Sequence, residues 1–157
     1  MNTDQLDVLG PILIGNNYKG TFPAHHRALY RLFTTENKPF GVIVNTDTAK
    51  YNGQHWIAIY VDRAHKKCFV FDSFGNADYS FHPDWRLLTR HHNTDVWFNT
   101  RIVQKARNTC ALHCLYFLYY IHHYKMKPTV VVRNMNDSKV KRFISTVYRN
   151  FNRNKTH

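Results

Sequence analysis

The amino-acid sequence predicts an α+β fold, in which a central mixed or antiparallel sheet packs against a buried helix and further helices flank it. Short runs rich in β-branched and aromatic residues cluster between residues 40 and 103, and segments of helical periodicity precede and follow them. The run 110–124 is apolar on nearly every face, as is typical of a helix at the centre of a domain. The chain has 157 residues, of which 43% are hydrophobic and 20% charged, so we assign 1–157 to a single globular domain.

Glycine and proline punctuate the first 36 residues, where we expect a coil, and a short helix is expected at about 24–33. The strands that follow are predicted from β-branched and aromatic enrichment. They are expected at 40–45, 54–61, 66–72 and 95–103. The second and third are joined by the four-residue loop 62–65, and 73–76 has the composition of a turn.

Two helices are expected in the last third of the chain. Asn108 or Thr109 is suited to cap the apolar helix, whose first residue is Cys110. Asp137 is suited to cap a C-terminal helix at about 137–152, where apolar residues recur at helical spacing. The other face of this helix is basic, which indicates a surface position.

The charge of the chain is strongly positive. There are 22 Lys and Arg against 10 Asp and Glu, a net charge of +12, and half of it lies in the last 25 residues. Such a field favours a polyanion, most simply DNA bound without sequence specificity. The side chains expected on one side of the last helix are Lys139, Arg142, Arg149 and Arg153. A solvated basic face with no dedicated partner explains the same pattern equally well.

Membrane and secretory signals are not expected. No apolar run approaches the roughly 20 residues of a membrane span, and no basic stretch precedes the apolar N-terminal residues. The 3 cysteines are too few and too odd in number for a disulfide framework, which predicts reduced thiols in an intracellular compartment.

Cys110 is the candidate nucleophile among these cysteines. It stands at the start of the apolar helix, where the helix dipole and free N–H groups favour a thiolate. The alternative is a buried structural cysteine, the commoner fate of a cysteine beside apolar residues. Cys114 and Cys68 lie within apolar segments and are expected in the core.

His55 and Asp72 are the candidate base and its orienting acid. If 62–65 form the hairpin loop, Val61 pairs with Lys66, and the same antiparallel register places His55 opposite Asp72. An aspartate there can fix the imidazole tautomer and stabilise the imidazolium. The alternative is an ordinary edge histidine beside a turn aspartate.

Gln104 lies six residues before Cys110, where a side-chain amide can donate to a developing oxyanion. The alternative for this region is a zinc cluster, because Cys110, His113 and Cys114 fall at i, i+3 and i+4 of one helix. Their spacing matches no established zinc or haem motif, so no metal site is expected.

The order of these residues resembles that of the adenovirus-type maturation proteases and their wider clan of ubiquitin-like-protein proteases. The resemblance extends over roughly residues 16–117. It rests on the stretches Gly41-Val-Ile-Val-Asn-Thr46, Asn52-Gly-Gln-His-Trp56, Lys67-Cys-Phe-Val-Phe-Asp-Ser-Phe-Gly75 and Gln104-Lys-Ala-Arg-Asn-Thr-Cys110. The chain departs from the adenoviral pattern at Ala111, where Gly is usual, and at Asp72, where Glu is usual.

The resemblance implies a Cys-His-Asp cysteine endopeptidase that needs no cofactor. Cys110 would be the nucleophile, His55 the base, Asp72 the orienting acid and Gln104 the oxyanion donor, while Trp56 would shape the substrate cleft. Viral capsid precursors are the implied substrates, in the virion and in the infected cell, whether in a virus factory or in the nucleus. DNA is a candidate activator, and whether a peptide activates the enzyme stays open.

Two other functions fit the same residues. One is a basic DNA-binding virion protein on the same fold with an inactive site. The other is a protease that acts on host ubiquitin-like conjugates. Residues 85–97 contain no cysteine, so activation through a disulfide to a capsid-derived peptide is not expected.

Overall fold

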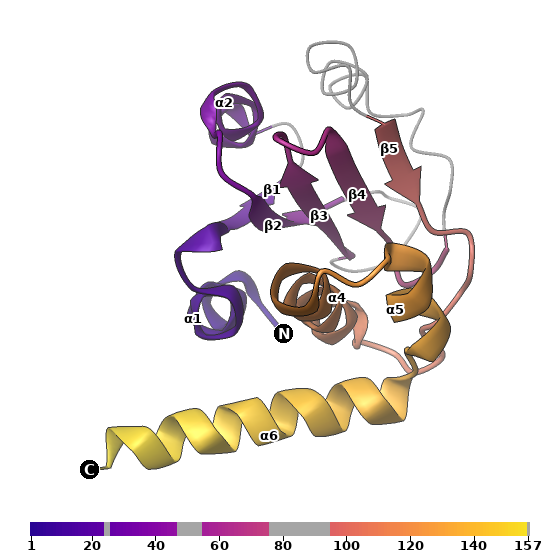
Figure 1. Cartoon of the computed structure of the whole chain (residues 1–157). Helices are drawn as coiled ribbons and strands as arrows, with labels where there is room; N and C mark the ends of the chain where they lie inside the picture. Colours follow the sequence, from indigo (N-terminus) through magenta and orange to yellow (C-terminus); the bar gives the residue numbers. More distant parts are fainter. Residues whose placement is uncertain (24–25, 47–54, 76–94, 157) are drawn as a thin grey trace.

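The fold is a five-stranded mixed sheet with helices on both faces (Figure 1), which confirms the predicted α+β class. A computed structural model describes residues 1–23, 26–46, 55–75 and 95–156. The strands are β1 (Tyr18–Pro23), β2 (Phe40–Asn45), β3 (Trp56–Asp62), β4 (Lys67–Phe71) and β5 (Asp95–Phe98), in that spatial order. The inner pairs β2–β3 and β3–β4 are antiparallel, whereas β1–β2 and β4–β5 are parallel.

The sheet separates two hydrophobic layers, because alternate side chains of each strand point to opposite faces. On one face Ala58, Tyr60 and Phe71 pack against the helix α4 (Cys110–Tyr124), whose bounds match those predicted. On the other face Ile57 and Ile59 pack against α2 (Arg27–Thr35), the predicted short helix. Figure 1 shows α4 covered in turn by α1 (Thr3–Ile14) and α6 (Asp137–Lys155), which makes it the central helix.

The prediction of coil in the N-terminal segment was wrong, because residues 3–14 form α1. Asn2 caps this helix in a reciprocal capping box with Gln5. Pro11 lies inside the helix, and its cost is outweighed because one apolar face, including Leu6 and Leu13, is buried in the core. A short 3-10 turn (Gly15–Asn17) then leads into β1, which was also missed.

Three further elements differ from the prediction. The helix α5 (Pro128–Asn134) was missed, because its β-branched sequence is a weak helix former. The last strand ends at Phe98 instead of continuing to 103. The C-terminal helix begins after Asn136, whose side chain accepts from the backbone N–H of Lys139, so Asp137 is not its cap. The other expected cap, Thr109, precedes α4 without a capping side-chain bond.

In the part of the chain that the structure describes, no helix combines the length and the hydropathy needed to cross a bilayer.

Candidate active site

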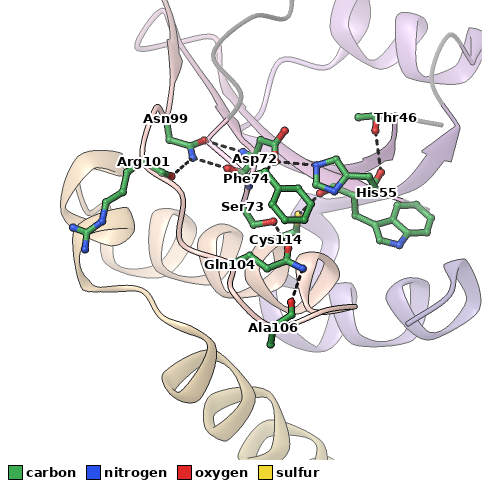
Figure 2. Close-up of polar contacts among 11 residues, drawn as sticks. Thr46, His55, Asp72, Ser73, Phe74, Asn99, Arg101, Gln104, Ala106 and Cys114 are labelled. Atoms are coloured by element: carbon green, nitrogen blue, oxygen red, sulfur yellow. Dashed lines mark hydrogen bonds and ion pairs between the residues drawn. The ribbon is translucent and has the colours of Figure 1, made fainter. Parts of the chain in front are cut away.

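The ends of the inner strands β3 and β4 and the start of α4 bring the predicted catalytic residues together. His55 directly precedes β3, Asp72 directly follows β4, and Cys110 is the first residue of α4. Their exposed fractions are only 4%, 2% and 6%. The Nε2 atom of His55 lies 2.8 Å from Oδ1 of Asp72, and Figure 2 shows the two side chains facing one another.

The register by which this contact was predicted is wrong by two residues. The hairpin loop is 63–66 instead of 62–65, so Val61 pairs with Cys68 instead of Lys66. His55 and Asp72 are therefore diagonal neighbours beyond the last ladder pair instead of direct partners. Because strand side chains alternate, a shift of two residues keeps both on the same face. Diagonal side chains are still within reach of each other.

The hydrogen bonds of His55 assign its two ring nitrogens. Nε2 faces the carboxylate, so Nδ1 is the nitrogen left for the hydrogen bond with Cys110. Burial opposes the charged imidazolium, but the hydrogen bonds to Asp72 and Cys110 outweigh it and raise the pKa of His55 from 6.5 to about 9. At neutral pH the imidazole is therefore protonated.

The thiol of Cys110 responds in the opposite sense. Burial disfavours the thiolate, but the hydrogen bond from His55 and backbone groups of Trp56 and Ala111 lower the pKa of Cys110 below its ordinary 9.0. The shifts of His55 and Cys110 together favour a thiolate–imidazolium pair, the reactive form of a cysteine nucleophile.

Cys68 and Cys114 behave as core residues. Cys114 is fully buried and donates to the carbonyl of Trp56 at 3.4 Å. Burial raises the pKa of Cys68 to about 12, and it raises that of Cys114 well above 9.0. Among the 3 cysteines of the chain, Cys110 alone has a lowered pKa.

Asp72 is held by neighbours that the sequence analysis did not identify. Its Oδ1 accepts from the backbone N–H of Phe74 at 2.8 Å. Asn99 bonds the backbone of Asp72 on both sides, accepting from its N–H at 2.8 Å and donating to its carbonyl at 2.6 Å. The ring of Phe74 lies 4.9 Å from that of His55, which restricts the imidazole (Figure 2). The one sequence signal for Asn99 is that this asparagine directly follows the apolar residues 96–98 of a predicted strand.

Gln104 is buried beside this group with its amide oriented. The hydroxyl of Ser73 donates to Oε1 of Gln104 at 2.6 Å, and Nε2 donates to the carbonyl of Ala106 at 2.8 Å (Figure 2). The carbonyl of Ala106 can only accept, so the NH₂ group faces the loop before Cys110 and the oxygen is left for the serine hydroxyl. An amide carries two hydrogens. Within the described residues, the second hydrogen has no protein acceptor.

Trp56 is the first residue of β3 and is 3% exposed, in the cluster that packs against α4. Backbone groups of Trp56 form hydrogen bonds with Cys110 and Cys114, while its indole packs in the hydrophobic core. Over the described ranges, no group of three His, Cys, Asp or Glu side chains is arranged to hold a metal ion. In particular, Nδ1 of His113 donates to the carbonyl of Thr109 at 2.8 Å.

The four basic residues singled out on the last helix are all exposed. At 3.6 residues per turn they fall within an arc of about 80° on α6. This arc is opposite the face that carries the buried Val140 and Ile144.

A buried cysteine, histidine and aspartate meet at the ends of two inner strands of a mixed sheet, with the cysteine at the start of the central helix, and this arrangement is typical of cysteine peptidases. A family model described as adenovirus endoprotease matches residues 20–157, which is most of the chain. The chain belongs to the adenovirus endoprotease family.

Individual relatives agree with this assignment. The chain is 29% identical over 132 residues to a protease of Ovine adenovirus D serotype 7 (isolate OAV287), covering 76% of this chain and 63% of the relative. It is 36% identical over 69 residues to a protease of Avian adenovirus 8 (strain ATCC A-2A), covering 40% and 34%. The chain thus spans less than two thirds of the length of these relatives.

The fold is similar to that of the crystal structure of the ASFV pS273R protease. The TM-score is 0.68 at 17% sequence identity, over 92% of this chain and 65% of that chain. The likeness concerns the fold alone.

Proposed function

We propose that this chain is a viral cysteine endopeptidase. The observation that carries the proposal is the buried group His55, Asp72 and Cys110, in which the pKa of the imidazole is raised and that of the thiol lowered. Among the described cysteines and histidines, Cys110 has a lowered pKa and His55 a raised pKa, and these directions favour a thiolate and an imidazolium. Family membership supports the same chemistry.

The first half of the reaction follows from the positions of these groups. The Cys110 thiolate attacks the carbonyl carbon of the scissile peptide bond and forms a tetrahedral intermediate. The free hydrogen of the Gln104 amide is suited to donate to the oxyanion as it develops. The His55 imidazolium then gives its proton to the leaving amine, and a thioester to Cys110 remains.

The second half regenerates the thiolate. Neutral His55 takes a proton from water, the resulting hydroxide attacks the thioester carbonyl, and the carboxylic acid product leaves. Asp72 keeps its bond to Nε2 throughout, so Nδ1 is always the nitrogen that exchanges the proton.

Capsid precursor proteins are the proposed substrates, cleaved during particle maturation in the virion or elsewhere in the infected cell. The match to the adenovirus endoprotease family over residues 20–157 favours this substrate class over host ubiquitin-like conjugates. The perturbed pKa values favour an enzyme over a DNA-binding protein with an inactive site, because an inactive site has no use for a thiolate.

The test of the activity compares two cysteines one helical turn apart. Cys110→Ala and Cys114→Ala are assayed on a library of peptides derived from capsid proteins of the source virus. Cys110→Ala should abolish cleavage with an unchanged circular dichroism spectrum, whereas Cys114→Ala should cleave with lower thermal stability. Cleavage by Cys110→Ala, or no activity in Cys114→Ala when it is folded, contradicts the proposal.

We also propose that viral DNA binds to the exposed basic arc of α6, which would concentrate the enzyme beside its substrates in a packed particle. Four phosphate contacts predict a slope of log K against log salt of about −3.6. Replacing Lys139, Arg142, Arg149 and Arg153 with Gln should remove most of that slope and leave cleavage of a short free peptide unchanged. Undetectable affinity for duplex DNA at low salt, or an unchanged slope, contradicts this part.

A further inference from the structure

The loop 105–109 connects the proposed oxyanion donor Gln104 to the proposed nucleophile Cys110. It follows Gln104 and precedes Cys110, so its conformation sets where the amide and the thiolate lie relative to one another. It belongs to no helix or strand, and Asn108 has φ of +60°. Its backbone N–H groups therefore need partners from elsewhere in the fold.

For the first two residues of the loop, the partner is one carboxylate on another element. Oδ2 of Asp137, in the first turn of α6, accepts from the backbone N–H groups of Lys105 and Ala106, both at 2.9 Å. Its Oδ1 lies 3.1 Å from the hydroxyl of Thr109, which shares its one hydrogen between this oxygen and the carbonyl of Ala106 at 3.0 Å. Asp137 thus holds the beginning and the end of the loop at once, although it lies about 30 residues further along the chain.

Ala106 connects this carboxylate to the oxyanion donor. Its N–H is held by Asp137, and its carbonyl accepts from Nε2 of Gln104 at 2.8 Å. Movement of this one peptide unit would carry the bonded amide with it. The position of Gln104 consequently depends on Asp137 through two successive hydrogen bonds.

His113 lies beside the same carboxylate on the α4 side. It is fully buried, and its Nδ1 donates to the carbonyl of Thr109. Its Nε2 lies 3.4 Å from Oδ1 of Asp137, and no described residue forms a hydrogen bond with it. Burial and Lys141 lower the pKa of His113 despite the opposing bond to Thr109 and the charge of Asp137. The neutral ring therefore offers a lone pair towards the carboxylate.

We propose that Asp137 is a positioning residue for the oxyanion donor of this enzyme, acting through the loop 105–109. The inference rests on the proposed cysteine endopeptidase activity. It adds a contact from the C-terminal helix to the centre formed by the sheet and α4. Asp137 touches no reacting atom itself.

Three variants separate this role from helix stability. Asp137→Ala removes both carboxylate oxygens from the loop. Asp137→Asn keeps one oxygen for Lys105 and Ala106, and its NH₂ can donate to the lone pair of His113 Nε2 or to the Thr109 hydroxyl. Asn136→Ala is the matched control, because it removes the true cap of α6 without touching the loop.

Each variant is assayed for kcat and KM on a cleaved peptide, and for the rate at which chloroacetamide alkylates Cys110. Asp137→Ala should lower kcat by about 10- to 100-fold, because a misplaced donor costs that much, with KM within about twofold. Its alkylation rate should stay within about twofold, because His55, Trp56 and Ala111, which lower the pKa of the thiol, lie outside the loop. Asp137→Asn and Asn136→Ala should keep kcat within about threefold.

Equal kcat in Asp137→Ala and Asn136→Ala would overturn the inference, and so would alkylation that falls in parallel with kcat. A wild-type chain that is alkylated at Cys110 but cleaves no peptide would contradict the proposed function instead. Amide hydrogen exchange at Lys105 and Ala106 then tests the hydrogen bonds between Asp137 and the loop independently of enzyme activity. Protection lost in Asp137→Ala and kept in Asn136→Ala supports it, and protection kept in both overturns it.

Discussion

Replacing His55 with alanine should suppress the ionisation of Cys110. The hydrogen bond and the charge of His55 oppose the burial of the thiol, and burial remains when the imidazole is gone. A thiol at the ordinary pKa of 9.0 is about 1% ionised at pH 7, and burial reduces that fraction further. Relative to a wild-type thiol that is largely ionised at pH 7, alkylation of Cys110 in His55→Ala should be slower by about 100-fold, less an offset because a thiolate of higher pKa is more nucleophilic.

The assay is alkylation by chloroacetamide between pH 5 and 10, followed by mass spectrometry of the peptide that contains Cys110. Cys68 and Cys114 are internal controls, because their raised pKa values and burial should keep them unmodified. His65→Ala is the matched histidine variant. It removes an exposed imidazole bonded to Asp62, remote from the thiol, and should leave the profile unchanged.

The same pKa values predict different profiles for alkylation and for cleavage. Alkylation needs only the thiolate, so it should rise through the lowered pKa of Cys110 and stay high. Cleavage also needs the imidazolium to protonate the leaving amine, so it should fall again as the pH passes the His55 pKa of about 9. A profile for His55→Ala that overlays the wild type, or modification of Cys114 at neutral pH, would refute the reasoning.

Three further substitutions test two residues of the site and one packing contact of α1. Gln104→Ala should lower kcat by roughly 10²–10³ at similar KM, and a change in KM alone would indicate substrate binding instead. Asp72→Asn should reduce kcat less than His55→Ala does. It should also move the alkaline limb of the cleavage profile to lower pH, because the carboxylate raises the pKa of the imidazole. An alkaline limb at the wild-type pH would contradict this. Gly10→Ala should destabilise the fold by about 1–3 kcal/mol in urea denaturation, because its Cβ would lie 2.4 Å from the Tyr18 ring. Alanine usually stabilises a helix relative to glycine, so an increase in stability would show that the ring moves aside.

The contact between His55 and Asp72 could be predicted from the sequence although its register could not. Loop length decides register, and the chain reverses one residue later than the composition suggested, at 63–66. The two residues still meet, because a register change of two residues leaves both side chains on the same face of the sheet. The bonds from Asn99 to the backbone of Asp72 could not be predicted in this way, because they depend on how β5 leaves the sheet.

The N-terminal helix could not be predicted because local signals oppose it. Gly10 and Pro11 usually interrupt a helix, yet both lie within α1. The glycine is required by tertiary structure, since the Tyr18 ring occupies the space where a Cβ would stand. Burial of Leu6, Leu9 and Leu13 against α4 supplies the compensating energy, and that partner lies about 100 residues away in the chain.

The position of the last cap shows how a local ambiguity can hide a long-range contact. Asn136 and Asp137 are both good capping residues, and the prediction named Asp137 alone. In the fold the neutral side chain caps the helix, and the charged one lies one residue inside it. From there the carboxylate reaches the loop before Cys110, where three donors lower the pKa of Asp137 against the effect of burial. Charge explains the division of roles: an amide oxygen suffices for a single helix N–H, whereas a carboxylate can serve the separate donors of the loop with both oxygens.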